Sequence, residues 1–527
     1  AGRLLPCSLP GRGGAARLPA VDPATGERAR VAVVGGGIAG CACAYSLARS
    51  GYQVTIYESR PQLGGNAQTA AFPLGGGRAP VAQDLSVLFW APEYYRNYSE
   101  LLRVLGLEPV SMQLPYVIHR KVGGVSEFYT PPGHASGLDK MLQPSMEQRF
   151  EQDFRRYDRM IGVVSRCGDL FSWGSSRPTF YRTNQYAALS FANPFNYIGM
   201  RSCARMFGIS SDFYETILRP FHALSLTTVH IDSKPATGYQ VLDNIAPLHY
   251  SREVCTWGAG TSQEVFQRAA AGSDVLLDTR VRQVRPVPPA AGAGWRQTVV
   301  DDKGVERVFD RVVFACPATA ADAMLRSSSW LERSLLGGVA YHDELHNDDW
   351  RDWLESQLHQ DPRCLPEKHR AEILEHAAFL IDVDEAGRQG EGGGPGAARN
   401  VEFTHNLGAF SASARAAGVP AAERKMFMTQ CHHASSEYDD DGALGTFSAP
   451  RGHPKLSYTN LVVTQLLHLV QGRRGVWYCS NWTSPGNGHD LACTSGLAVA
   501  SAIGADYPLP CPEAARDHRD CRRFMCI

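Results

Sequence analysis

The clearest hydrophobic pattern in the chain is a short apolar run at residues 31–34, followed by glycines and then by a segment with helical spacing. Residues 31–34 read Val-Ala-Val-Val, which is typical of a strand buried on both faces. Residues 41–50 repeat small apolar side chains at helical spacing, and residues 54–57 form a second apolar run. The pattern predicts a strand, a turn, a helix and a second strand in immediate succession.

The turn after the first predicted strand contains a G-x-G-x-x-G motif at residues 35–40. Gly35 permits a tight turn, Gly37 lets the backbone approach a pyrophosphate, and Gly40 allows close packing of the helix on the strand. The helix N-terminus, which includes Ile38 and Ala39, offers N–H groups and a positive dipole to phosphates. These five residues are therefore predicted to bind a dinucleotide.

An acidic residue closes the second predicted strand. Glu58 lies 18 residues after Gly40, where a carboxylate can accept both hydroxyl hydrogens of an adenosine ribose. The same carboxylate would repel a 2′-phosphate, so the motif argues against NADP at this site.

Composition sets wider bounds on the protein. Its 527 residues predict two to four domains. A hydrophobic content of 44% excludes a disordered or collagen-like chain. The 52 Lys and Arg residues almost balance 53 Asp and Glu residues, which gives no electrostatic reason to expect nucleic acid as a partner. No apolar run approaches the roughly 18 residues that a transmembrane helix needs, so no transmembrane segment is expected.

The fourteen cysteines are too sparse for a disulfide scaffold, and most are predicted to be small buried hydrophobes in a reducing compartment. Cys511, Cys521 and Cys526 differ because they lie in a polar, Arg-rich segment. Free thiols and a local disulfide both remain open for these three.

Residues 1–21 contain arginines and small residues but no acidic residue. This bias is typical of the remnant of an organelle transit sequence, with a plastid favoured over a mitochondrion. A flexible extension is the alternative.

The segment after Glu58 narrows the dinucleotide to FAD. Residues 58–69 resemble the E-x-R-x-x-x-G-G-[RHN]-x-x-T segment of the flavin-containing amine oxidase superfamily. The resemblance implies that the arginine lies near the pyrophosphate and the paired glycines near the ribityl chain of FAD. The residues expected at the cofactor in this segment are Ser59, Arg60, Gly64, Gly65 and Asn66.

Four later segments resemble this family in the same order. Residues 84–87 resemble its D-x-G-x element, with Ser in place of Gly, and residues 257–261 resemble its W-x-G-G-x signature. Residues 275–284 resemble the strand whose valine, here Val281, borders the adenine. Residues 309–317 resemble the strand that returns to the Rossmann sheet.

A last strand at residues 476–480 leads through residues 485–490 into a small-residue helix at residues 495–504, as in the family's closing flavin segment. His489 and Asp490 precede that helix and are expected at the cofactor. Asp490 is interpreted as a helix N-cap, and His489 as a residue packed on FAD, with proton donation as its alternative role. The usual Ala-Gly-acid before the loop is replaced here by Cys479-Ser480-Asn481.

We therefore predict an α/β protein with a discontinuous Rossmann-like FAD-binding domain and a second α+β substrate domain. The FAD-binding domain is assigned to residues 29–88, 253–325 and 474–506, and the substrate domain to residues 89–252 and 326–473. Residues 1–28 form an extension, residues 382–400 a flexible, non-catalytic loop, and residues 507–527 a C-terminal tail. Rings concentrated at residues 171–197 suit an apolar substrate pocket.

No metal site is predicted, because the histidines at 342 and 346 lack the H-E-x-x-H pattern and residues 431–433 would alternate faces on a strand. Nucleophile motifs such as G-x-S-x-G are absent.

The expected function is oxidation, desaturation or isomerisation of an apolar, lipid-like substrate by hydride transfer to FAD, and no residue stands out as catalytic. Residues 219–220 and 456–461 resemble bacterial FAD-binding proteins associated with cyclopropane-fatty-acyl synthases. The alternative is a structural or assembly subunit of a larger organellar complex.

Overall fold

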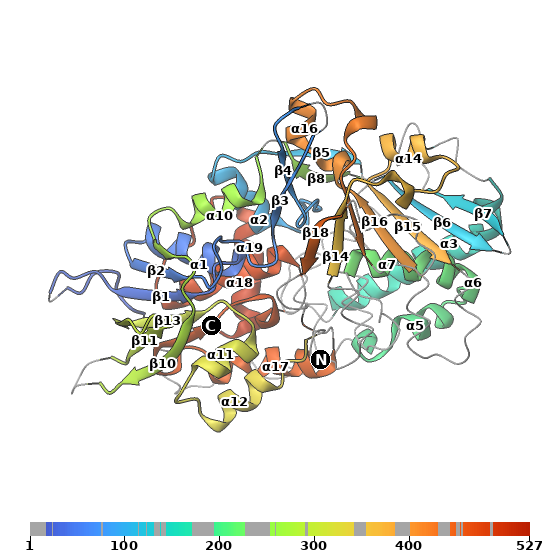
Figure 1. Cartoon of the computed structure of the whole chain (residues 1–527). Coiled ribbons are helices and arrows are strands. Elements are labelled where there is room, and N and C mark those ends of the chain that lie inside the picture. Colours follow the sequence, from blue (N-terminus) through green and yellow to red (C-terminus); the bar gives the residue numbers. More distant parts are fainter. Residues whose placement is uncertain are drawn as a thin grey trace.

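A computed structural model describes most of the chain (Figure 1). The described residues are 17–23, 25–74, 77–113, 115–122, 124–130, 138, 144–170, 194–226, 253–258, 260–289, 294–341, 355–384, 401–430, 443–448, 454, 457–484 and 488–527. A parallel sheet with its helices forms a first body, and a larger mixed sheet with its helices forms a second.

A five-stranded parallel sheet lies at the centre of the first body, in the order β19-β13-β1-β2-β9. Its strands are β1 (Arg30–Val34), β2 (Gln53–Tyr57), β9 (Asp274–Leu276), β13 (Arg311–Phe314) and β19 (Val476–Tyr478). Because these strands come from widely separated parts of the sequence, the domain is discontinuous, as the sequence predicted.

Alternate residues of each strand face opposite sides of this sheet, and other elements pack on both of its faces. Val31 and Val33 of β1 pack beneath one layer of helices. These helices are α1 (Ile38–Arg49), α2 (Arg96–Val104), α10 (Ser262–Ala270) and α18 (His489–Ile503). Ala32 and Val34 of β1 face the other side, in a second apolar cluster. That side is covered by α11 (Ala318–Met324), α12 (Trp330–Gly337), α17 (Tyr458–Leu466) and a three-stranded sheet.

The three-stranded antiparallel sheet contains β10 (Val281–Val287), β11 (Arg296–Asp301) and β12 (Glu306–Phe309). The single strand expected at residues 275–284 is therefore wrong. Its first part belongs to β9 in the parallel sheet, and its last part begins β10. The chain changes direction between them at Asp278, which has a positive φ of 47°.

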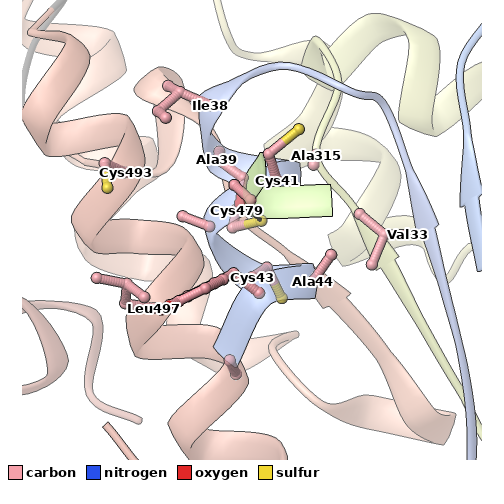
Figure 2. Close-up of a cluster of buried hydrophobic side chains, with 14 of the residues drawn as sticks. Val33, Ile38, Ala39, Cys41, Cys43, Ala44, Ala315, Cys479, Cys493 and Leu497 are labelled. Carbon is pink, nitrogen blue, oxygen red and sulfur yellow. Dashed lines mark hydrogen bonds between the residues drawn. The ribbon is translucent and has the colours of Figure 1, made fainter. Parts of the chain in front are cut away.

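Four buried cysteines lie where α1 and α18 approach the parallel sheet. Figure 2 shows Cys41 and Cys43 of α1 near Cys479, which follows β19, and Cys493 of α18. Burial raises the pKa of the Cys41 and Cys493 thiols, while a hydrogen bond with Cys43 and then burial raise the pKa of Cys479. The prediction that these cysteines act as small buried hydrophobes is confirmed.

The second body is built on a seven-stranded mixed sheet in the order β18-β14-β17-β16-β15-β6-β7. Its strands are β6 (Tyr116–Val122), β7 (Val125–Tyr129), β14 (Glu355–His359), β15 (Phe379–Asp384), β16 (Val401–Asn406), β17 (Phe427–Gln430) and β18 (Ala443–Ser448). Neighbouring strands are antiparallel except for β6 and β15, which run parallel. The flexible loop expected from residue 382 is wrong at its start, because residues 382–384 end β15; residues 385–400 lie outside the described part.

One long helix and several short ones cover the seven-stranded sheet. Those near its β6 and β7 side are α3 (Pro144–Leu170), α5 (Met200–Met206), α6 (Ser211–Phe213), a π-helical turn (Tyr214–Leu218) and α7 (Arg219–Leu226), and their apolar side chains form one cluster with the sheet. Others are α14 (Arg370–His376), α15 (Leu407–Phe410) and α16 (Ala412–Ala416). The remaining described strands form two antiparallel two-stranded ribbons. One pairs β3 (Thr69–Phe72) with β4 (Val81–Asp84), and the other pairs β5 (Pro109–Gln113) with β8 (Glu253–Trp257).

The C-terminal residues form a helix, α19 (Pro512–Met525), that packs on α18 and α2. Asp517 forms an ion pair with Arg96 of α2 at 2.9 Å, and the Tyr507 hydroxyl donates to Asn97 Oδ1 at 2.7 Å. Residues 507–527, expected as a separate tail, are therefore part of the first body. Cys521 is buried there.

Within the described part of the chain, no helix combines the length and hydropathy needed to cross a membrane.

Candidate functional site

The glycine-rich turn connects β1 to α1, as the sequence predicted. Gly35 has a positive φ of 112°, and a Cβ placed on it would lie 2.5 Å from the carbonyl oxygen of Ala315. A Cβ on Gly40 would lie 2.0 Å from the carbonyl oxygen of Gly35. The packing of the chain itself therefore requires glycine at these two positions.

Gly37 differs from the other two glycines of the motif. A Cβ placed on it would have Gly65 Cα as its nearest neighbour, at 3.9 Å. Packing within the protein therefore does not explain why position 37 lacks a side chain. A ligand that approaches the backbone at Gly37 does explain it, and a pyrophosphate fits this position.

The first turn of α1 is suited to bind an anion. Gly37 is the N-cap residue, and no side chain caps the helix there. Ile38 and Ala39 are buried in the first turn. Backbone N–H groups at a helix N-terminus lack partners within the helix and carry a positive partial charge, so they can donate to phosphate oxygens.

The segment that follows β2 folds back toward this turn. Gly65 lies against Gly37, since a Cβ on Gly65 would be 3.3 Å from Gly37 Cα. Arg60 Nη1 donates to the Gly65 carbonyl at 2.9 Å, and this bond holds the segment in place. A Cβ on Gly64 would lie 2.4 Å from the carbonyl oxygen of Ala67, so Gly64 is needed for the local chain path. Asn66 is half-buried beside them.

Glu58 forms hydrogen bonds with both the glycine-rich turn and the segment that follows β2. Its Oε2 accepts from the backbone N–H of Gly36 at 2.7 Å, and its Oε1 accepts from the backbone N–H of Arg60 at 3.0 Å. Each carboxylate oxygen can accept a further hydrogen bond, so contact with ribose hydroxyls remains compatible with these bonds. Ser59 is exposed next to it and contacts Glu58 Oε1 at 3.4 Å.

The segment between β9 and β10 runs alongside residues 58–60. The N–H of Thr279 donates to the Glu58 carbonyl at 2.9 Å, and the N–H of Asp278 donates to the Arg60 carbonyl at 3.0 Å. Val281 follows directly and is buried. The structure thus brings Val281 to the same side of the parallel sheet as Glu58, and its contact with adenine stays a prediction.

Helix α18 packs against the start of α1. A Cβ placed on Gly496 of α18 would lie 2.1 Å from the carbonyl oxygen of Ala39, so the two helices touch through their backbones. Both helices follow strands of one parallel sheet, β1 and β19, and start at its carboxyl edge. Ligands of open α/β sheets bind at that edge.

Asp490 caps a neighbouring helix and not its own. The N-cap residue of α18 is Gly488, and Asp490 lies in the first turn. Asp490 Oδ1 accepts from the backbone N–H of Tyr98, in the first turn of α2, at 2.6 Å. The N-cap interpretation is therefore wrong, because this carboxyl satisfies a donor of α2. Burial raises the pKa of Asp490 to about 8, so the group is largely protonated at neutral pH.

His489 lies in an aromatic setting at the start of α18. Its ring packs edge-on against Tyr98 at a centroid distance of 4.7 Å, and Phe266 of α10 lies 6.4 Å away. Burial lowers the pKa of His489 to about 3, so the imidazole is neutral under ordinary conditions.

His489 Nε2 and the Tyr98 hydroxyl are both buried, and neither has a hydrogen-bond partner among the residues that the structure describes. Buried polar atoms are normally paired, so these two atoms are candidates to bind a polar group from outside the described residues. A bound cofactor with polar atoms fits this position. The sequence had no signal for Tyr98, which is 391 residues from His489 in the chain.

Asp84 joins the predicted D-x-S-x segment to α10. Its oxygens accept from the backbone N–H of Ser262 at 2.9 Å, from the Ser262 hydroxyl at 2.7 Å and from the Thr69 hydroxyl at 2.5 Å. Asp84 thus fixes α10 and β3 relative to each other, and this is a structural role.

The other predicted sites are less well described. Residues 342–350, residues 431–433 and the rings at residues 171–193 lie outside the described part of the chain. Among the residues that the structure describes, no group of three or more His, Cys, Asp or Glu side chains is placed to hold a metal ion.

Comparison with known proteins agrees with this geometry. The family model of the flavin containing amine oxidoreductases matches residues 38–342.

Two solved structures share the overall fold. A fatty acid isomerase from P. acnes that produces CLA has a TM-score of 0.57 at 14% identity, over 90% of this chain and 99% of that one. A putrescine oxidase variant has a TM-score of 0.55 at 15% identity, over 90% and 98%.

Curated relatives are similar over shorter regions. A bifunctional protein of tRNA 5-methylaminomethyl-2-thiouridine biosynthesis from Legionella pneumophila is 37% identical over 156 residues, which cover 28% of this chain and 22% of that protein. The carotenoid phi-ring synthase of Streptomyces griseus is 54% identical over 61 residues, or 10% and 12%. The chain therefore spans less than a quarter of each of these two relatives.

Proposed function

Because the chain belongs to the flavin-containing amine oxidoreductase family, we propose that this FAD-dependent oxidoreductase oxidises, desaturates or isomerises an apolar, lipid-like substrate. The observation that carries the cofactor assignment is Gly37, whose missing side chain is not explained by any contact among the described residues. The sequence motif and the helix N-terminus both point to that position, and the family match begins at the next residue.

Different residues around Gly37 bind different parts of FAD in this proposal. The N–H groups at the start of α1 face the pyrophosphate, with Arg60 adding positive charge, and Glu58 accepts from the ribose of the adenosine half. Gly64 and Gly65 would lie along the ribityl chain, as the family resemblance implies. Bound FAD supplies the hydride-accepting chemistry, for which the protein provides binding, orientation and electrostatics.

The start of α18 forms the other boundary of the cofactor site. His489 Nε2 and the Tyr98 hydroxyl are both buried and have no partner in the described part of the chain, so each can form a hydrogen bond with the cofactor. Because its low pKa keeps His489 neutral, it positions the cofactor and does not deliver a proton near neutral pH.

The surroundings of the cofactor segment favour an apolar substrate. Leu85 and Leu88, which follow Asp84, belong to an apolar cluster with side chains of the seven-stranded sheet, and Phe89 packs on Phe379 at 5.4 Å and on Phe410 at 6.3 Å. The side chains that join the two bodies here are thus aliphatic and aromatic.

His405, which contacts this apolar cluster, adds no charge to it. His405 packs edge-on against Phe379 at 5.0 Å, and burial lowers its pKa to about 4. A protonated amine would lose hydration here without gaining a charged partner, whereas a hydrocarbon chain would not. The names of the fatty acid isomerase and the carotenoid synthase among the similar proteins support the same substrate class.

Anaerobic titration of the purified holoprotein tests this proposal. We expect the oxidised-flavin absorbance band to fall, or a conjugated diene to appear in the ultraviolet, with an unsaturated fatty acid or a carotenoid precursor. Putrescine and longer polyamines serve as the matched comparison and should change neither signal. Flavin reduction by polyamines, with none of these changes by lipids, would reverse the substrate assignment.

A further inference from the structure

Three polar side chains on neighbouring strands of the seven-stranded sheet lie in a line. His119 of β6 has its Nδ1 3.2 Å from Asp382 Oδ2 of β15 and its Nε2 3.0 Å from the Ser126 hydroxyl of β7. The order carboxylate, imidazole Nδ1, imidazole Nε2, serine hydroxyl is the one that activates a serine nucleophile. None of the three residues belongs to the cofactor site.

The strand register brings these residues together. His119 is the partner of Asp382 in the parallel pair β6–β15, so their side chains share one face of the sheet. In the antiparallel pair β6–β7, His119 faces Phe128 and Lys121 faces Ser126. Because alternate residues of a strand point the same way, all five side chains lie on the same face.

His119 is held rigidly between its two partners. The ring is 1% exposed and stacks on Phe128 at a centroid distance of 4.6 Å and an angle of 16°. Lys368 and His369 contact other sides of the Phe128 ring, at 5.8 Å and 5.1 Å. A carboxylate can only accept a hydrogen bond, so Asp382 keeps the proton on Nδ1 and leaves Nε2 as an acceptor for the serine hydroxyl.

Ser126 can be reached from solvent although its base is buried. It is half-buried on β7, which is the edge strand of the sheet, and its neighbour Val125 is 63% exposed. Lys121, the ladder partner of Ser126, is exposed on the same face of the sheet, so its ammonium group can approach a substrate at the serine. A positive charge beside the nucleophile stabilises negative charge that develops on an attacked carbonyl oxygen.

We propose that Ser126, His119 and Asp382 form a second active site that hydrolyses neutral or anionic carboxylic esters through an acyl-serine. The Ser126 oxygen forms a bond to the acyl carbon while His119 Nε2 takes the hydroxyl proton. The carbon–oxygen bond to the alcohol then breaks, and the alcohol leaves with that proton. Water, deprotonated by His119, attacks the acyl-serine, and the carboxylic acid and free Ser126 are released.

The residues of this site have distinct roles. Ser126 is the nucleophile and His119 the general base, since both touch the reacting atoms. Lys121 stabilises the negative charge on the carbonyl oxygen and disfavours cationic esters. Asp382 acts through His119 and is a positioning residue.

The test uses the full-length holoprotein and a fluorophosphonate probe, which reacts with activated serines. Intact mass and peptide mapping should show one adduct on Ser126, and p-nitrophenyl acetate should be hydrolysed with an initial burst. Ser126→Ala should remove both signals. Ser413→Ala, at a half-buried serine on α16, is the matched control and should change neither.

The rate at which Ser126 is labelled tests Asp382 separately, because a residue with a purely structural role would not change that rate in a folded protein. Asp382→Asn should slow labelling of Ser126 by about 10²- to 10⁴-fold, since it loses the carboxylate that selects the histidine tautomer. Asp382→Glu restores the carboxylate and should recover part of the rate, with flavin absorbance verifying that both variants are folded.

Two results would overturn the proposal. The first is a wild-type protein that carries its flavin but forms no adduct at Ser126. The second is labelling that is as fast in Asp382→Asn as in the wild type.

Discussion

Replacement of Glu58 by glutamine should weaken both the binding of FAD and the fold of the apoprotein. The carboxylate is 7% exposed and accepts from the N–H of Gly36 at 2.7 Å and of Arg60 at 3.0 Å. A glutamine side chain has one acceptor oxygen, and its amide nitrogen only donates. One of the two backbone N–H groups therefore loses its acceptor and faces an amide hydrogen.

The magnitude follows from these bonds. A hydrogen bond to a charged group contributes about 1.5–3 kcal/mol, so the free energy of unfolding of the apoprotein should fall by about that amount in Glu58→Gln. The ribose hydroxyls lose a charged acceptor as well, and the same range corresponds to a Kd for FAD that rises about ten- to a hundredfold.

Two assays separate these effects. Fluorescence titration of the apoprotein with FAD gives the Kd, and denaturant unfolding of the apoprotein gives the stability. Glu306→Gln is the control, because Glu306 forms an exposed ion pair with Arg285 and such pairs contribute little, so neither quantity should change. An unchanged Kd in Glu58→Gln would show that the carboxylate does not face the ribose, and unchanged stability would show that its two backbone hydrogen bonds are not formed.

Three further substitutions test the cofactor site. Gly37→Val should abolish FAD binding yet leave the apoprotein folded, because a Cβ there meets only Gly65 Cα at 3.9 Å; a folded variant that keeps a stoichiometric yellow chromophore would contradict the assignment. His489→Gln should lower FAD occupancy and leave the pH profile of flavin reduction unchanged, since the pKa of about 3 keeps the imidazole neutral. If the variant keeps FAD fully bound but its rate of flavin reduction no longer changes with pH near neutrality, His489 is a proton donor instead. Asp490 has a pKa of about 8 in the folded protein against an ordinary 3.8, so the folded state holds the proton more tightly and stability falls as pH rises from about 4 through 8. Asp490→Asn should remove that decline in melting temperature, and a variant that keeps the wild-type slope would refute the explanation.

The turn between β1 and α1 could be predicted from the sequence because the order strand, glycines, helix is visible in the hydrophobic pattern. The contacts with Ala315 and Gly65 that surround Gly35 and Gly37 come from distant parts of the chain and could not be predicted from the motif. The helix itself begins at Ile38, slightly earlier than its apolar spacing suggested.

Long-range contacts could not be predicted in the same way. Asp490 looked like the cap of its own helix, because the pattern gives no indication that the N–H of Tyr98 lies beside it in space. α18 begins at His489, well before the predicted residue 495, since its first turns carry polar side chains that hide the helical pattern. Ser126, His119 and Asp382 form no motif, because strand register alone brings them together. The predicted organelle location and complex membership rest on the sequence and stay predictions.

The backbone contact between Ala39 and Gly496 has a consequence for how the protein is made. Ribosomes add about 5–20 residues per second, so α1 emerges on the order of 20–90 s before α18 is complete. Until α18 is made, the part of α1 that it covers has no partner, and β13, once made, lacks its neighbour β19. Nascent chains of this protein should therefore depend on chaperones until α18 has been made, and the nucleotide-binding body should complete its fold only then although its motif is translated much earlier.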